Sequence, residues 1–131
     1  MKYLSNYVEQ AQSELFAEMG AFFAFSTKQF NEAKIDGVEY VSVGSGMICP
    51  KPNVDALIER LGNIHDSGIA QDVAENGVKA IIHRELANHE AQITGSIEAT
   101  SAALSGYPIT DDDIRAEWGE FMQYCRKHNY F

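Results

Sequence analysis

Apolar residues recur along the first 22 positions with the three- and four-residue spacing of one face of an α-helix. Polar residues such as Glu9 and Glu14 stand between them, so the pattern predicts an amphipathic helix. Its apolar stripe consists of Leu4, Val8, Ala11, Leu15, Met19 and Phe22. Ser26 and Gln29 match a capping box, which predicts a new helical turn after an extended stretch at residues 22–25. The phenylalanines of residues 22–30 are expected in the core.

The segment IDGVEYVSVGSGMICPKP has the clearest strand pattern in the chain. Asp36-Gly37 is a turn signal, and the β-branched and aromatic residues that follow favour strands. Gly44, Ser45 and Gly46 interrupt the apolar run, so residues 38–49 are predicted to form a small β-hairpin or a bulged strand.

Apolar residues return to helical spacing after Pro52. Asn53 is expected to cap a helix that Ser67-Gly68 ends. Its buried stripe would be Val54, Leu57, Ile58, Leu61 and Ile64. Residues 69–104 then contain no proline and predict one long helix, with Asn76-Gly77 as a point of bending. Its stripe would be Val78, Ile82, Leu86, Ile93, Ile97 and Leu104. A helix of that length exceeds the diameter of a small domain, so we expect it to kink or to form a homodimer.

The final helix has the strongest local start signal. Thr110 and Asp113 stand at capping-box positions, and Asp111, Asp112 and Asp113 lie at the positive end of the helix dipole. The stripe that follows is Ile114, Trp118, Phe121 and Cys125. Together these patterns predict one mainly α (α+β) domain over residues 1–131, with four to five helices, one of them long, and a small β element.

Charge narrows the classes of partner. Ten basic residues stand against 19 acidic residues, for a formal net charge of −9. This balance argues against direct binding to nucleic acid or to an anionic membrane. It permits a protein partner with a basic surface, although a solvated acidic surface is also common in cytosolic proteins. No apolar run approaches the roughly 20 residues of a membrane span, and no secretory signal pattern is present, so a cytoplasmic location in the producer or a host cell is expected. Cys49 and Cys125 are expected to be free, buried thiols.

The stretch IIHRELANHE holds two histidines and two glutamates within ten residues. A helical wheel separates them into two pairs on opposite margins of the apolar stripe. Glu85 and His89 are either an acid–base pair or a buried histidine satisfied by a carboxylate. His83 and Glu90 are candidate ligands for a metal, although such a site needs three or four.

The glycines at 44 and 46 suggest a backbone cradle for an anion, yet no helix start follows them and no nucleotide-binding pattern is matched. A turn is the simpler interpretation, and no cofactor is predicted.

The segments FFAFSTKQF and GYPITDDDIRAEWGEFMQYC give the chain a resemblance to small accessory proteins of phages and mobile elements. That resemblance implies inhibition or modulation of a host nucleic-acid-handling or defence protein. The leading hypothesis is therefore a non-enzymatic, acidic protein-binding module that uses Asp111, Asp112 and Asp113. The alternatives are a small enzyme or ligand-binding protein built on Glu85, His89 and the Gly44–Gly46 loop, and a structural helical oligomer.

Overall fold

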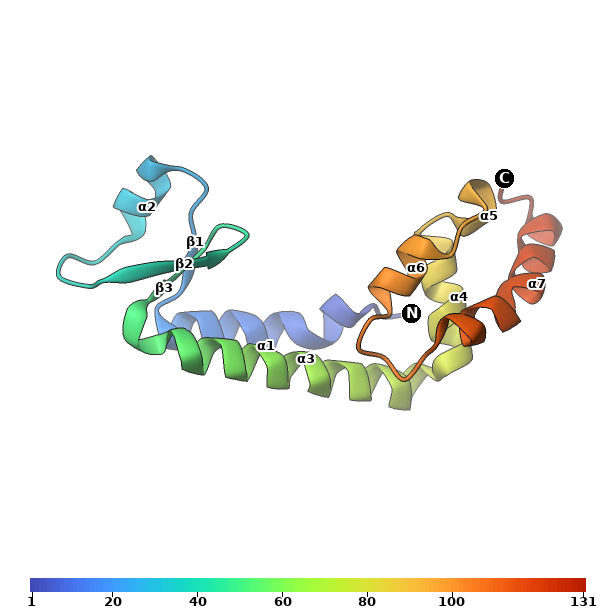
Figure 1. Cartoon of the computed structure of the whole chain (residues 1–131), viewed down its shortest axis with the longest axis horizontal. Helices are drawn as coiled ribbons and strands as arrows, with labels where there is room; N and C mark the ends of the chain where they lie inside the picture. The colour runs from blue at the N-terminus through green and yellow to red at the C-terminus, as the bar shows by residue number, and fades with distance from the viewer. The chain divides into compact units, whose positions relative to one another are not determined.

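Seven α-helices and one three-stranded antiparallel sheet make up the computed structural model, which describes all residues from Met1 to Phe131 (Figure 1). This architecture confirms the predicted fold class, mainly α with a small β element. The chain divides into two compact units, one of residues 2–68 and one of Met1 with residues 69–131. Organisation as one domain over residues 1–131 stays a prediction.

The first unit places its sheet beside two long helices. Its elements are α1 (Leu4–Met19), β1 (Phe22–Phe23), α2 (Thr27–Ala33), β2 (Tyr40–Gly44), β3 (Met47–Pro50), a 3₁₀ turn (Lys51–Asn53) and most of α3 (Val54–Asn76). As predicted, Ser26 caps α2 through its hydroxyl, which accepts a hydrogen bond from the Gln29 amide. Asn53 was expected to cap α3, but it lies in the 3₁₀ turn and donates its side-chain amide to the Met19 carbonyl at 2.8 Å. It thus satisfies a carbonyl at the end of α1.

The sheet has the order β1-β3-β2 and contains the predicted hairpin. Strands β2 and β3 pair antiparallel with a register irregularity between Ser42 and Gly44. Ser45 and Gly46 have φ angles of 53° and 81°, the left-handed conformation that a tight hairpin turn requires at both central positions. β1 adds a third strand, with Phe22 opposite Ile48 and Phe23 opposite Met47.

Leu15, Cys49 and Leu57 form the centre of the core in this unit. The predicted end of the helix at Ser67-Gly68 is wrong, since α3 continues to Asn76. A Cβ at Gly68 would lie 2.4 Å from Val8 Cγ1, so this glycine allows α1 and α3 to approach each other closely. Ile58 was predicted in the buried stripe but is 58% exposed.

The second unit contains α4 (Val78–Asn88), α5 (Ala91–Thr94), α6 (Glu98–Ala103) and α7 (Asp111–His128). The predicted continuous helix over residues 69–104 is therefore wrong, but the predicted point of bending at Asn76-Gly77 is confirmed, because α3 ends at Asn76 and α4 begins at Val78. Left-handed or otherwise positive φ angles interrupt it at Gly77 (79°), Glu90 (50°) and Gly95 (70°). The expected homodimer was based on that continuous helix and stays a prediction without it.

Helix α4 is the centre of this unit, because it packs against α5, α6 and α7. Ile81, Ile82 and Leu86 supply its fully buried face, and Ile114, Phe121 and Cys125 supply that of α7. These three belong to the predicted stripe of α7, whose fourth member, Trp118, is only partly buried. Ile93, by contrast, is 61% exposed. Thr110 and Asp113 form the predicted capping box at the start of α7. Both cysteines are buried and free, and none of the helices combines the length and apolar content needed to cross a bilayer.

Candidate functional site

Two exposed phenylalanines, Phe23 and Phe25, and the partly buried Phe16 form an aromatic face on the first unit. Phe16 of α1 meets Phe23 of β1 edge to face, with ring centroids 5.7 Å apart. Phe23 in turn stacks on Phe25, with the centroids 6.2 Å apart and the ring planes 6° from parallel. Phe23 is 49% exposed and Phe25 is 73% exposed, so the expectation that these two rings belong to the core is wrong.

The hairpin turn holds the Phe25 ring in place. A Cβ built on Gly46 would lie 2.3 Å from the nearest atom of this ring, which shows that the ring rests against the glycine backbone. The backbone amide of Ala24 donates to the Gly46 carbonyl at 2.8 Å, and that of Phe25 donates to the Gln29 side chain at 2.7 Å. Phe25 is therefore an exposed aromatic residue in a fixed position, not a side chain free in solvent. This also gives the Gly44–Gly46 turn a structural role.

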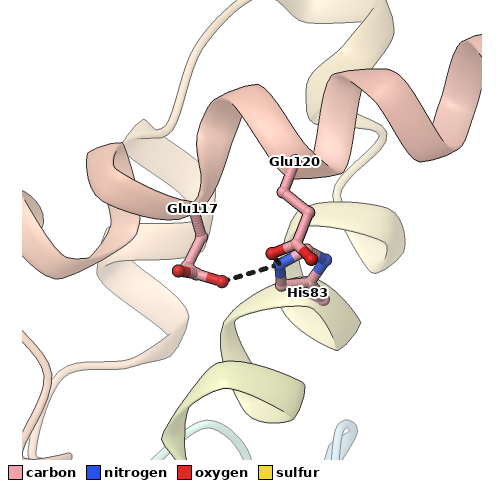
Figure 2. A group of neighbouring side chains, drawn as sticks. All are labelled: His83, Glu117 and Glu120. Carbon is pink, nitrogen blue, oxygen red and sulfur yellow. Dashed lines mark hydrogen bonds and ion pairs between the residues drawn. The ribbon is translucent and has the colours of Figure 1, made fainter.

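A histidine and two glutamates meet between α4 and α7 in the second unit (Figure 2). His83 Nε2 lies 3.0 Å from Glu117 Oε1 and 3.8 Å from Glu120 Oε2. One ligand atom from each of the three side chains lies within 4.8 Å of the other two. The His83 ring also meets the Phe121 ring edge to face at 6.1 Å. Two opposing helices thus bring an imidazole and two carboxylates to one place.

Lys79 balances part of the negative charge in this cluster. Its Nζ lies 2.7 Å from Glu120 Oε2 and 3.9 Å from Glu117 Oε1. The hydrogen bond from Lys79 lowers the pKa of Glu120, and the pKa of Lys79 is raised by the same bond. Lys79, His83 and Glu120 line a surface pocket of about 510 Å³, so the cluster is open to solvent.

The structure does not bring His83 and Glu90, the predicted metal ligands, together. His83 faces α7, whereas Glu90 follows the end of α4 with a positive φ and has no place in the cluster. The sequence analysis missed Glu117 and Glu120. Their i,i+3 spacing was visible, but only the packing of α7 on α4 reveals that they face His83.

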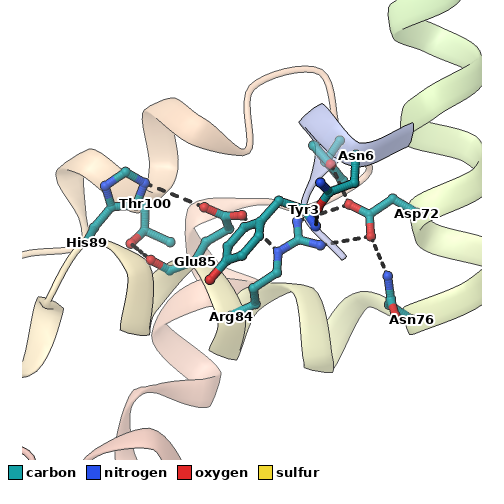
Figure 3. Close-up of polar contacts among 9 residues, drawn as sticks. Tyr3, Asn6, Asp72, Asn76, Arg84, Glu85, His89 and Thr100 are labelled. Atoms are coloured by element: carbon teal, nitrogen blue, oxygen red, sulfur yellow. Dashed lines mark hydrogen bonds and ion pairs between the residues drawn. The ribbon is translucent and has the colours of Figure 1, made fainter. Parts of the chain in front are cut away.

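A buried ion network connects α4 to the end of α3 (Figure 3). The guanidinium of Arg84 donates to both carboxylate oxygens of Asp72, at 2.9 and 3.0 Å, and its Nε donates to Glu85 at 2.9 Å. Tyr107 and Asn76 donate two further hydrogen bonds to Asp72, at 2.6 and 2.8 Å. Burial alone would raise the pKa of Asp72, but the bonds from Arg84, Tyr107 and Asn76 outweigh it and leave that pKa below its ordinary value. The arrangement holds the buried Asp72 carboxylate ionised, a structural role.

Glu85 and His89 do lie together, as their spacing predicted. His89 Nε2 is 3.5 Å from Glu85 Oε2, within ion-pair distance but without hydrogen-bond geometry. Glu85 is 7% exposed, and its other carboxylate oxygen accepts the bond from Arg84. This carboxylate is thus already engaged in the buried network.

The three aspartates at the start of α7 are exposed but have local partners. Asp113 accepts a hydrogen bond from the Thr110 backbone amide, Asp112 forms an ion pair with Arg115 at 3.3 Å, and the Ser101 hydroxyl donates to Asp111. The backbone hydrogen bond from Thr110 lowers the pKa of Asp113. Capping and local pairing give these carboxylates a structural role, and their use in binding a partner protein stays a prediction.

Comparison with known proteins places the chain in a family. No curated protein and no solved structure matches it. Residues 4–124 match a family of unknown function, DUF7659, which spans both units. The chain therefore belongs to the DUF7659 family.

Proposed function

We propose that the protein is a non-enzymatic protein-binding module whose aromatic face, formed by Phe16, Phe23 and Phe25, contacts a basic surface on the partner. The observation that carries this proposal is the position of Phe25, which is 73% exposed and yet fixed by Phe23 and Gly46. Rigid aromatic side chains contribute strongly to interfaces, because they bury a large area at little cost in conformational entropy.

Arginine side chains suit such a face. A guanidinium stacks on an aromatic ring through cation–π attraction, which contributes about 0.5–1 kcal/mol at an exposed site and more when water is excluded. The formal charge of −9 adds long-range attraction to a basic partner and speeds association at low salt. Proteins that handle nucleic acid carry basic grooves, and they are the class of partner that we favour.

The rival functions have weaker support. Aromatic rings also stack on nucleotide bases, but such sites combine stacking with a positively charged groove, and the charge here has the opposite sign. An enzyme built on Glu85 and His89 needs an available carboxylate, whereas Glu85 is 7% exposed and bonded to Arg84.

Fluorescence anisotropy with three probes of equal length tests the chemistry of the partner. The probes are an arginine-rich peptide, a lysine-rich peptide and a single-stranded oligonucleotide. We expect the arginine peptide to bind more tightly than the lysine peptide, because lysine stacks less well on aromatic rings, and the oligonucleotide not to bind. Equal affinity for both peptides, or binding of the oligonucleotide alone, would contradict the proposal.

A further inference from the structure

We infer that His83, Glu117 and Glu120 form a binding site for a divalent transition-metal cation, with zinc as the preferred ion, which links α4 to α7. The site lies in the second unit and is independent of the aromatic face proposed to bind a partner.

The donor atoms suit this class of ion. An imidazole nitrogen with two carboxylate oxygens favours zinc over magnesium, which takes oxygen ligands and keeps several waters. In a tetrahedral zinc site with bonds of about 2.0–2.2 Å, neighbouring donor atoms lie about 3.4 Å apart. The distances of 3.0 and 3.8 Å from His83 Nε2 to the two carboxylates fall on either side of that value. All three ligand atoms lie within 4.8 Å of one another, so side-chain rotations that shorten the longer distances would complete a bound geometry.

The surroundings of the three side chains give an ion access and leave room for a fourth ligand. The pocket of about 510 Å³ beside His83 and Glu120 gives the ion access and leaves room for water as a fourth ligand. The edge-to-face contact with Phe121 restricts the His83 ring, and Phe121 itself is buried. One ligand is therefore held in position before an ion arrives.

Lys79 takes the place of the cation when no metal is bound. Its ammonium lies 2.7 Å from Glu120 Oε2, the same oxygen that lies 3.8 Å from His83 Nε2, so an ion bound between these two atoms has to displace it. Lys79 is itself 65% exposed at the side chain, and nothing in its exposure prevents it from turning into solvent. This competition distinguishes a metal site from a simple ion-pair cluster. Loss of Lys79 should strengthen zinc binding if the cluster is a metal site, whereas a simple ion-pair cluster would only lose one of its ion pairs.

Isothermal titration calorimetry of the full chain with ZnCl₂ tests the assignment. We expect one zinc per chain, and weaker binding of Mn²⁺ and Mg²⁺. His83→Gln and Glu120→Gln should each weaken zinc binding at least about tenfold, because each removes one of three protein ligands. The matched controls His65→Gln and Glu59→Gln change exposed residues of α3 and should leave the affinity unchanged.

Lys79→Gln is expected to strengthen zinc binding about two- to fivefold, as the loss of an exposed competing ion pair implies. Glu120 is 55% exposed at the side chain, so Glu120→Gln is expected to fold even if His83→Gln does not, and circular dichroism checks both. Zinc binding that is unchanged in the folded Glu120→Gln protein, or no binding at about 1 mM zinc, would overturn the site. Phe25→Ser should not alter zinc affinity. Failure of the zinc site can therefore be distinguished from failure of the proposed partner binding.

Discussion

Arg84 and Asp72 meet through two parallel hydrogen bonds of 2.9 and 3.0 Å, with side chains only 3% and 0% exposed. The pair joins the C-terminal turns of α3 to α4 within the second unit. Because charges are costly to bury, such a pair is maintained only when every remaining donor and acceptor also finds a partner. Here Glu85, Tyr107 and Asn76 supply those partners.

Replacing Arg84 with methionine is expected to lower the free energy of unfolding by about 3–5 kcal/mol, because Asp72 and Glu85 are left as buried carboxylates without their cation. Chemical denaturation measures this change. Adding Asp72→Asn to Arg84→Met should recover part of the loss, since one of the two unpaired charges disappears. If the double variant instead loses the sum of the unfolding free energies lost by the two single variants, the two side chains act independently.

Alkaline pH should weaken the fold through Tyr107. Burial, followed by the hydrogen bond to Asp72, raises the pKa of Tyr107 to about 12. The folded protein therefore keeps this proton between about pH 10 and pH 12 while the unfolded chain loses it, so stability falls with rising pH by about 1.4 kcal/mol per unit in that window. Below pH 10 the contribution is complete.

The matched variant Tyr107→Phe has no phenol to titrate. The difference in unfolding free energy between the two proteins should thus shrink steadily from pH 10 to pH 12, as measured by urea denaturation at each pH. A difference that stays constant over this range would contradict the raised pKa.

Two glycines in α3 should respond in opposite directions to alanine. A Cβ at Gly68 would lie 2.4 Å from Val8 Cγ1 and 3.2 Å from Leu4 Cδ1, whereas a Cβ at Gly62 meets nothing within 4 Å. We expect Gly68→Ala to destabilise the protein by about 1–3 kcal/mol, because the buried, β-branched Val8 side chain has little freedom to move aside. Gly62→Ala should stabilise it by about 0.5–1 kcal/mol through helix propensity. A thermal unfolding series on both variants tests the pair, and equal shifts of Tm would refute the close approach.

Gly68 also shows the limit of prediction from sequence patterns. Periodicity and capping predicted the first and last helices and the hairpin, because those signals are local to each element. At Ser67-Gly68 the pattern resembled a helix end, yet the glycine serves a tertiary contact with Val8. Glu90 is the reverse case. It is not a glycine and gave no signal of a helix end, yet it adopts a left-handed conformation that ends the helical stretch.

The candidate sites depended even more on tertiary structure. Glu85 and His89 were correctly paired, because both belong to one helical turn. His83 was assigned to Glu90 by extending a helical wheel beyond the real end of α4, while its actual neighbours, Glu117 and Glu120, lie 34 and 37 positions further along the chain. The exposed position of Phe25 was equally invisible, since an apolar run has the same composition in a core and on a surface.

The comparison of Phe25→Ser with Phe131→Ser tests the proposed binding function most directly. Both variants remove a phenylalanine that is more than half exposed, at 73% and 61%, but only Phe25 belongs to the aromatic face. With the arginine-rich peptide as ligand, we predict that Phe25→Ser weakens binding about tenfold or more, as expected for a central aromatic contact, while Phe131→Ser binds like the wild type. Equal affinities for the two folded variants would contradict the account.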